Sequence, residues 1–419
     1  MINFELVGKL RLGQESDKFK PYQERVFESG WANRTLLFNA ICGDNRHMLQ
    51  IQGGTYPERK DYNIITFGPS TVDPDGTRHS GERIEIPWKL RSLQSNIDKV
   101  AEFKKFVVDL EEFGRRALLE QYCTKIHEGG SLTDEDLAKV GLKEESEVAE
   151  ALEKSKSRKK EFISAWDMAE FVKKMLESDK YKDRLFYVKG SFSCQYSDAK
   201  QQWYINMTPQ KISLARPDAE EYSVGKATLL FGPGAVDDLS LDEKGKYFIK
   251  AYTMEYDSAR KKNIPCEFQL VIPKGISDTD GRHNNEDVER TQRLINKFIV
   301  EDDSVKEIGI EFDILNGSQK VEITEDMLTD EQRGDLALGL ISMDDIRRDL
   351  GNTVYGERIR ENRYKKFMKG YGNGTRKDTA YSLEDLEIPP IDNGATDGYF
   401  NEEKIEKSED SDEDEDLLG

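Results

Sequence analysis

The sequence predicts a mixed α+β protein with two small β-barrels joined by a helical segment, then a mixed helical C-terminal region and a disordered acidic tail. Two segments contain short apolar runs with period-2 alternation between turn residues, which is typical of β-strands. Charge is unevenly distributed: residues 276–419 hold 19 Lys/Arg and 38 Asp/Glu, almost all of the formal net charge of −20. The predicted domains are 1–111 (β-rich), 112–186 (helical insert or connector), 187–275 (second β-barrel), 276–370 (linker and small mixed α/β region) and 371–419 (acidic tail).

Residues 1–111 open with a strand pattern. In INFELVGKLRLG, Phe4, Leu6 and Leu10 alternate with Glu5 and Lys9, as in a half-buried strand. EFKKFVVDL fits either a closing strand or the start of a helix. Further β-like runs, separated by turn signals such as DPDG, are RTLLFNAICG, HMLQIQGG, YNIITFG and ERIEIPWKL.

Residues 112–186 change to a helical pattern. Thr133 is an N-cap candidate because Asp136 follows three residues later, a variant of the capping box. SAWDMAEFVKKMLES places Trp166, Phe171 and Met175 near one face of a helix. We expect a helical connector that packs on one side.

Residues 187–275 contain the clearest β pattern. LFYVKGSFSCQYSDAKQQWYINMTPQKISLA predicts a strand hairpin, and the segments ATLLFG and KGKYFIKAYTMEYDSARKKNIPCEFQLVIPKG predict at least three more strands. Gly190 lies inside the first of these strands, where a glycine allows the bend that closes a small barrel. We therefore predict a small closed barrel.

The last third of the chain is predicted to hold less regular structure. EIGIEFDILNGSQKVEIT is β-like, and a helical stretch broken by glycines follows from about Glu325 to Lys369. From Gly370 onward no apolar periodicity remains, and Gly, Pro, Asn and charged residues dominate. Such a composition cannot bury enough apolar surface to fold, so residues 371–419 are predicted to be largely disordered.

Motifs for enzymatic chemistry are weak. FGPGAVDD lacks the lysine of a phosphate-binding loop. DPDGTRHSGE and SDTDGRHNNE lack the spaced ligands of a calcium loop. PDAEEYSVGK has the carboxylates and lysine of a metal-dependent nuclease, but not an E-x-K element on a strand. These patterns favour a non-enzymatic protein without cofactor or metal.

The cysteine, histidine and hydropathy patterns indicate the cellular compartment in which the protein is expected. The four cysteines and four histidines are dispersed, which argues against a zinc site and favours reduced thiols of an intracellular protein. No apolar run approaches the roughly 18 residues of a membrane span, and no secretory signal is visible at the start. We expect a cytoplasmic protein without membrane contact.

The candidate site is a set of aromatic residues interleaved with isolated Lys and Arg on the predicted strands. Non-specific single-strand binding needs cations for phosphates and flat side chains for stacked bases. Both β-rich segments also have a net charge near +1. Aromatics of small barrels are often core residues, so the joint pattern counts for more than any member. The candidates are Lys9, Arg11, Trp31, Arg34, Phe38, Trp88, Lys189, Trp203, Tyr204, Lys211, Lys250 and Tyr252.

This arrangement resembles phage-encoded single-stranded DNA-binding proteins built on the OB fold. The strands FYVKGSFSCQYS, WYINMTPQKISLA and GKYFIKAYTMEY and the tail EDSDEDEDLLG carry the resemblance. It implies two OB-like barrels and a tail that docks partners through acidic residues and a terminal hydrophobe. The tail residues are Asp412, Glu413, Asp414, Glu415, Asp416, Leu417 and Leu418. In this family the hydrophobe is often aromatic, whereas this chain has Leu-Leu-Gly.

The sequence thus predicts a protein of phage DNA replication or recombination that binds single-stranded DNA without strong sequence preference, in the bacterial host cytoplasm. Polymerase or helicase partners would dock on the tail. The alternative is a virion or assembly protein that uses the same β modules for protein contacts, and a metal-dependent nuclease is the third reading. The sequence pattern does not determine whether DNA or RNA is preferred, nor the oligomeric state.

The acidic tail generates the first testable prediction. Its carboxylates would occupy a cationic groove in the absence of DNA, so deleting residues 408–419 should tighten binding of a single-stranded oligonucleotide. Salt screens this competition, so the gain should be largest at low salt. A salt titration of binding by both proteins measures it, and equal affinities at low salt would contradict it.

Overall fold

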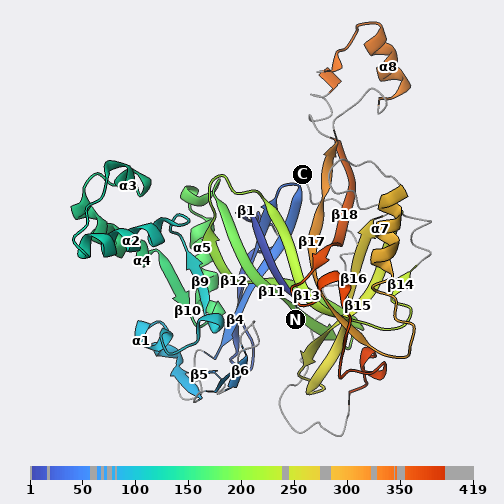
Figure 1. The fold of residues 1–419 in the computed structure, drawn as a ribbon, viewed down its shortest axis with the longest axis horizontal. Helices are drawn as coiled ribbons and strands as arrows, with labels where there is room; N and C mark the ends of the chain where they lie inside the picture. Colours follow the sequence, from blue (N-terminus) through green and yellow to red (C-terminus); the bar gives the residue numbers. More distant parts are fainter. Residues whose placement is uncertain are drawn as a thin grey trace.

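The computed structural model describes residues 2–16, 19–56, 64–67, 70–72, 78–80, 83–237, 245–273, 285–321, 328–343, 345–346 and 354–391. Figure 1 shows a mixed α+β architecture made mostly of sheet, which confirms the predicted class. The acidic tail residues 412–418 lie outside the described residues.

Five strands of the N-terminal half pair into a closed ring, called here the first ring. Its order is β1–β3–β4–β12–β11 and back to β1, antiparallel except between β4 and β12. Helix α5 (Ala165–Leu176) lies between β4 and β11 in the sequence and packs on the ring. The strands are β1 (Asn3–Leu12), β3 (Ala32–Cys42), β4 (Asn45–Thr55), β11 (Leu185–Ser197) and β12 (Gln202–Leu214).

Alternating burial explains the first ring. Every even-numbered residue of β3 is buried and every odd-numbered one is partly exposed, because successive side chains of a strand point to opposite faces. Within β11 the register shifts at Gly190, where a Cβ atom would lie 2.1 Å from the carbonyl oxygen of Thr208. Only glycine permits that approach.

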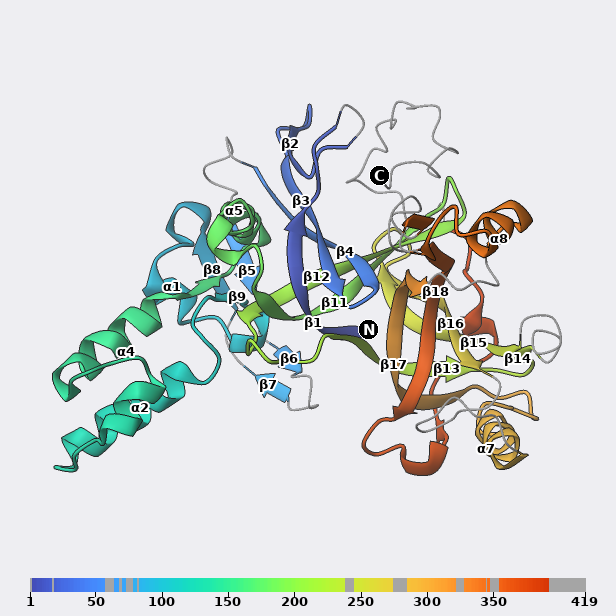
Figure 2. The ribbon, with the colours of Figure 1, turned by 90° about the horizontal axis from the view of Figure 1, so that it is seen from above.

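Five later strands pair into a second ring with the same order. It runs β13–β15–β16–β18–β17 and back to β13, and β16 and β18 are its parallel pair. Helix α7 (Asn285–Ile295) again lies between the third and fourth strands in the sequence. Strand β1 also pairs with β13 and so joins the rings, which lie side by side in Figure 2. The strands are β13 (Tyr222–Phe231), β15 (Lys246–Asp257), β16 (Lys262–Pro273), β17 (Lys306–Val321) and β18 (Val354–Phe367).

A helical lobe projects from the first ring (Figures 1 and 2). Helices α2 (Arg115–His127), α3 (Asp134–Lys139) and α4 (Val148–Ser157) have a small core of their own, which includes Leu119 and Val148. In the sequence the lobe is inserted between strands β9 (Phe106–Asp109) and β10 (Lys159–Phe162), which pair with each other. Thr133 caps α3 in a capping box with Asp136, as the sequence predicts.

The remaining elements are short, and they include helix α8, which lies between β17 and β18 in the sequence. They are β2 (Tyr22–Val26), β5 (Ile64–Phe67), β6 (Ser70–Val72), β7 (Arg78–Ser80), β8 (Ile84–Pro87), α1 (Gln94–Ile97), β14 (Val236–Asp237), α8 (Asp330–Ala337), β19 (Lys377–Asp378) and the 3-10 turns η1 (Trp88–Leu90), η2 (Glu102–Lys104), η3 (Glu145–Glu147), η4 (Asp179–Tyr181), η6 (Gly372–Gly374) and η7 (Glu384–Leu386).

The strand pairings correct the predicted boundaries. Residues 187–275 are divided between the rings, since β11 and β12 complete the first ring while β13 begins the second. The helical segment therefore interrupts the first ring and does not join two barrels. The second ring also takes β17 and β18 from the predicted linker region 276–370.

Two local predictions also fail. The stretch from about Glu325 to Lys369 is predicted to be helical, in short pieces. Helix α8 lies in it, but it also contains β18, because pairing with β17 and β16 overrides the helix propensity of its Arg, Glu and Lys residues. Residues 371–391 were predicted to be disordered, but β19 pairs with β17 and Tyr371 is buried against the core.

Buried His47 generates a prediction about pH. Its side chain faces the core of the first ring, its Nε2 has no hydrogen-bond partner among the described residues, and burial lowers its pKa to about 4. The unfolded chain binds a proton near pH 6.5 that the folded chain excludes, so stability falls as pH drops below that value. The loss between pH 7 and pH 5.5 is about 1 kcal/mol.

Urea unfolding at both pH values measures this loss. His47→Gln should flatten the pH dependence by that amount, whatever its effect on stability at pH 7. His127→Gln, at an exposed position on the helical lobe, is the matched control and should keep the wild-type slope. Equal slopes for wild type and His47→Gln would contradict the prediction.

Candidate nucleic-acid interface

Each ring has a hollow on the outer side of its second strand, next to the connection from the first strand. The first hollow, of about 270 Å³, lies where the β1–β3 connection meets the outer faces of β3 and β4. Its lining residues are Gln23, Arg25, Phe27, Asn33, Thr35, Leu37 and Gln52.

The first hollow combines the groups that a single strand needs. Phe27 is 46% exposed, so its ring is accessible from solvent. The Arg25 guanidinium donates two hydrogen bonds to Gln23 Oε1, at 3.1 and 2.8 Å, which holds the cation beside the hollow. Amide groups of Asn33 and Gln52 supply donors and acceptors. A flat ring, a cation and amides fit stacked bases and phosphate.

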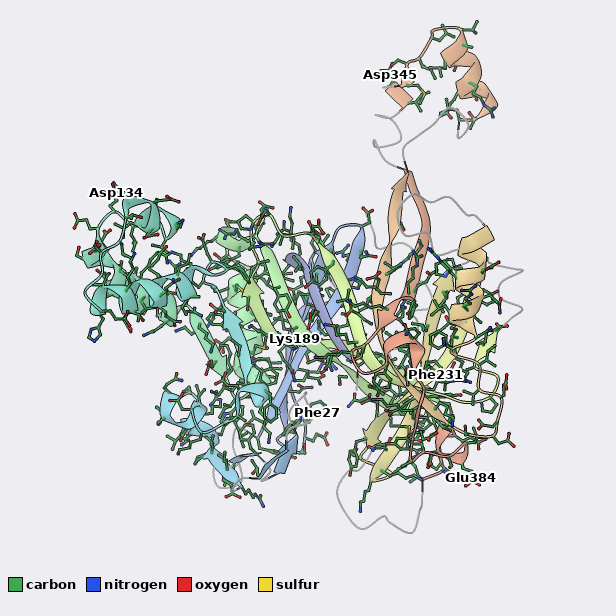
Figure 3. The ribbon with its side chains drawn as sticks, in the orientation of Figure 1. Phe27, Asp134, Lys189, Phe231, Asp345 and Glu384 are labelled. Atoms are coloured by element: carbon green, nitrogen blue, oxygen red, sulfur yellow. The ribbon has the colours of Figure 1, made fainter. Side chains whose placement is uncertain are left out.

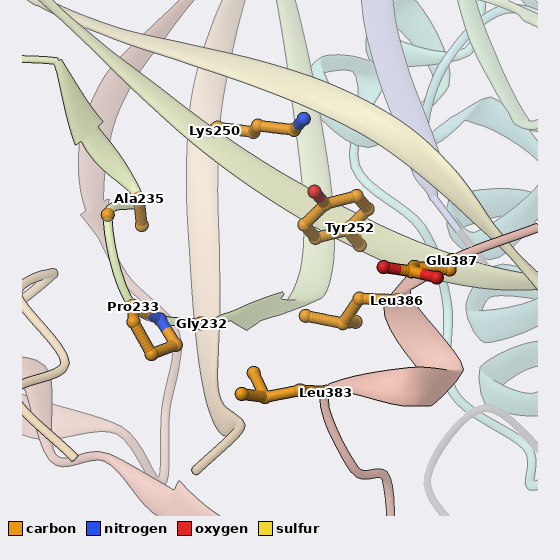
Figure 4. A pocket seen from close by; sticks show the side chains of 9 residues that line it. Gly232, Pro233, Ala235, Lys250, Tyr252, Leu383, Leu386 and Glu387 are labelled. Carbon is orange, nitrogen blue, oxygen red and sulfur yellow. The ribbon is translucent and has the colours of Figure 1, made fainter. Parts of the chain in front are cut away.

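The second hollow, of about 210 Å³, lies on the outer side of β15. Residues 232–235 of the β13–β15 connection line it together with Lys250 and Tyr252. Leu383, Leu386 and Glu387 of the C-terminal segment close it from the other side, as Figure 4 shows. The two hollows therefore occupy corresponding places in the two rings, and they differ in this cover.

Lys250 is held by its neighbours. Its Nζ lies 5.4 Å from the centroid of the Tyr252 ring and 3.2 Å from a carboxylate oxygen of Glu267. The hydrogen bond with Tyr252 and then the Glu267 carboxylate raise the pKa of Lys250. Lys250 and Tyr252, both predicted as site residues, are thus brought together as a cation and a ring on one outward face.

Two predicted site residues face the core. Phe38 is 1% exposed, and Arg34 is 8% exposed. The Arg34 guanidinium pairs with Glu24 at 2.7 Å and Glu170 at 3.0 Å, and it lies 4.1 Å from the centroid of the Trp166 ring. The two do share a strand face, but it is the inner one, so neither can contact a ligand in this conformation.

The predicted tryptophans of the first ring have different surroundings. Trp88 stacks under the Arg91 guanidinium at 3.9 Å and meets Trp166 edge-on, so it belongs to a structural cluster. Trp31 lies across a chain turn from Phe27, a lining residue of the first hollow. Its carbonyl oxygen accepts a hydrogen bond from the backbone N–H of Phe27 at 2.8 Å. Its ring packs edge-on against Tyr56.

The remaining predicted residues lie in separate groups on the first ring. Arg11 pairs with Asp183 at 3.0 Å, and Lys9 precedes it on the same face of β1. Lys189, labelled in Figure 3, and Lys211 are direct partners across β11 and β12 and are both exposed.

The aromatic pair of β12 is also divided. Trp203 packs against Tyr196, with ring centroids 5.3 Å apart. Tyr204 is 40% exposed, and Lys200 Nζ lies 5.8 Å from its ring centroid. The predicted residues therefore do not form one continuous track.

None of the residues that line the first hollow is among the predicted site residues. Arg25 and Phe27 lie in YQERVFESGW, where an aromatic residue follows a cation before a turn. That signal was present, but the segment shows no strand alternation of its own. Asn33 and Gln52 gave no signal, because amide side chains occur on any strand.

Other kinds of site receive no support from the part of the chain that the structure covers. Across these residues, no group of three or more His, Cys, Asp or Glu side chains is placed to hold a metal ion. No described helix is long and apolar enough to cross a membrane.

Comparisons with known proteins identify no family. No protein-family model and no curated protein match the chain. Among solved structures, a deletion mutant of the single-stranded DNA-binding protein from Thermus aquaticus is similar, with a TM-score of 0.26 and 10% sequence identity over 75% of this chain and 87% of that chain. A likeness this low carries no argument about fold or function.

The Arg34 cluster generates a prediction about stability. Arg34→Met removes a buried cation that three elements share, and it leaves Glu24, Glu170 and the carbonyl oxygen of Trp166 without that partner. The free energy of unfolding should fall by about 2 kcal/mol, since both carboxylates are half-exposed and can rehydrate. Urea unfolding measures this, with exposed Arg25→Met on the same hairpin as control. A change below about 0.5 kcal/mol would contradict the structural role.

Proposed function

We propose that this chain is a non-enzymatic protein that binds single-stranded DNA without strong sequence preference, through the outer faces of its two rings. The strand order supports the proposal. Each ring has the order 1-2-3-5-4, a parallel pair between strands 3 and 5 and a helix between strands 3 and 4 in the sequence. This is the topology of the OB fold, in which the face of strands 2 and 3 and the loop between strands 1 and 2 bind oligonucleotides.

The position of the two hollows carries the proposal. Both lie beside the connection between strands 1 and 2 and on the outer face of strand 2, where an OB fold takes its ligand. Each contains an aromatic ring and a cation, Phe27 with Arg25 and Tyr252 with Lys250. Stacking accepts any base because every base has a flat face, so such a site has little sequence preference.

The wider role in the proposal follows from the sequence resemblance. The protein would act in phage DNA replication or recombination in the bacterial cytoplasm, without a cofactor. Its acidic tail would compete with DNA and dock a polymerase or helicase.

A second function has an observation in its favour. Leu338 and Leu340, which follow α8, are 75% and 69% exposed on an arm that projects beyond the second ring in Figure 1. Exposed leucines on a projecting arm suit protein contacts, as in a virion or assembly protein. Absence of oligonucleotide binding at about 50 mM salt would favour this function, because the phosphate contribution is strong at low salt.

The first hollow generates a prediction about binding. Phe27→Ala should weaken binding of a labelled deoxythymidine oligonucleotide by about 5- to 100-fold, the contribution of one stacked base. Arg25→Ala should lower the slope of log affinity against log salt by about 0.7, the contribution of one phosphate contact on a single strand. Fluorescence anisotropy at several salt concentrations measures both effects.

Phe113→Ala is the matched control. Phe113 is 69% exposed but precedes helix α2 of the helical lobe, away from either hollow. Its variant should bind like wild type. If Phe27→Ala and Arg25→Ala both keep the wild-type affinity and salt slope, the first hollow is not part of the binding site. An RNA competitor of the same length tests the preference for DNA.

A further inference from the structure

The C-terminal segment after β18 crosses the second ring and covers its hollow. Asp378 of β19 pairs with Lys306 at the start of β17, and the salt bridge between them measures 2.8 Å. Further along, Arg260 in the β15–β16 turn donates a hydrogen bond to the carbonyl oxygen of Pro389 at 2.6 Å. The chain is thus attached at both ends. Residues 381–391 are called here the strap.

A short capped turn presents two leucines of the strap to the hollow. The backbone N–H and hydroxyl of Ser382 donate to Asp385 at 2.8 and 3.0 Å, which stabilises the turn η7. Leu383 and Leu386 are three residues apart and so lie on one side of this turn. Figure 4 shows both side chains pointing into the hollow beneath Tyr252.

Gly232 provides the space for these leucines. A methyl group at Gly232 would lie 3.2 Å from Cδ1 of Leu386 and 3.3 Å from Cδ2 of Leu383, closer than a comfortable packing distance. The glycine therefore leaves room for the ends of both leucine side chains beside it. Both leucines remain partly exposed, so the contact is one that a ligand can displace.

The chemistry of the strap matches the ligand proposed for this face. Its sequence YSLEDLEIPPI has three carboxylates and no cation. Glu387 lines the hollow together with Lys250, and the leucines lie against the face that carries Tyr252. Carboxylates thus stand where phosphates would meet lysine, and apolar side chains stand where bases would meet the ring.

No such cover exists on the first ring within the described residues. The first hollow is lined by residues of β2, β3 and β4 and by Phe27 next to β2. The chain continues from the strap into the acidic sequence 392–419. The two rings therefore present one open face and one covered face.

From this difference, and resting on the proposed function, we propose that the strap is an intramolecular occupant of the second ring's binding face, which takes single-stranded DNA only after the strap leaves. Short oligonucleotides bind the first ring alone. Long ones engage both rings once the strap is displaced, and linkage of two sites then raises the overall affinity.

The test compares full-length wild type with Leu383→Ala/Leu386→Ala on short and long deoxythymidine oligonucleotides. The strap variant should occupy more nucleotides per chain at saturation and bind the long oligonucleotide roughly tenfold more tightly. Its affinity for the short one at the first ring should equal that of wild type, while the opened second ring adds a further site for it. Leu338→Ala/Leu340→Ala, a pair of exposed leucines on the α8 arm, is the matched control and should behave as wild type in both assays.

A second variant and a positional readout protect the test against misfolding. Glu387→Lys keeps both leucines and reverses one charge at the hollow, and it should change site size and affinity in the same direction. Oligonucleotides with 5-bromodeoxyuridine should photocrosslink to Tyr252 in both strap variants and much less in wild type when the oligonucleotide is short.

The outcomes separate the two proposals. Wild type that binds DNA, with strap variants of unchanged site size and affinity, would overturn the strap while the proposed function stands. Equal crosslinking of Tyr252 to the short oligonucleotide in wild type would do the same. No binding by wild type or by either strap variant at about 50 mM salt would overturn both proposals together.

Discussion

Strand β1 is the constraint on which the rest of the structure depends. Its ten residues pair with β3 and β11 in the first ring and with β13 in the second. Its side chains Phe4, Leu6 and Leu10 are buried in the common core. Because β1 helps to close the first ring and also pairs with β13 of the second, the orientation of one ring is coupled to that of the other through its backbone.

The second strand of each ring, β3 or β15, contributes outward-facing residues to the hollow of that ring. Strand β3 turns Arg34 and Phe38 inward and Thr35 and Leu37 outward, and β15 turns Lys250 and Tyr252 outward. A one-residue change of register would exchange these sets. The content of each hollow is therefore fixed by how the ring closes, since closure decides which half of an alternating strand meets solvent.

The sequence predicts the strands well but not their partners. Period-2 alternation locates β1, β3, β11 and β15, and the capping box locates α3, because both signals are local. The boundaries at 187 and 275 fail because more than a hundred residues separate β4 from its parallel partner β12, and no local pattern records such a pairing. Arg34 is predicted on a binding face because an isolated arginine interleaved with aromatic residues suits a phosphate contact. Its ion pairs with Glu24 and Glu170 become visible only when α5 is packed on the ring.

The covered face also resolves an apparent conflict in the charge distribution. A chain with a net charge of −20 repels polyanions at long range, so its binding faces need local cations that its own acid does not neutralise. The first hollow meets this condition with Arg25, which hydrogen-bonds to an amide of Gln23. The second does not, because Glu267 and the strap surround Lys250 with carboxylates. A strand of DNA that displaces the strap removes one of those carboxylates and gains the lysine in the same step. In the proposed function, the strap thus sets the order in which the two rings become available to one ligand.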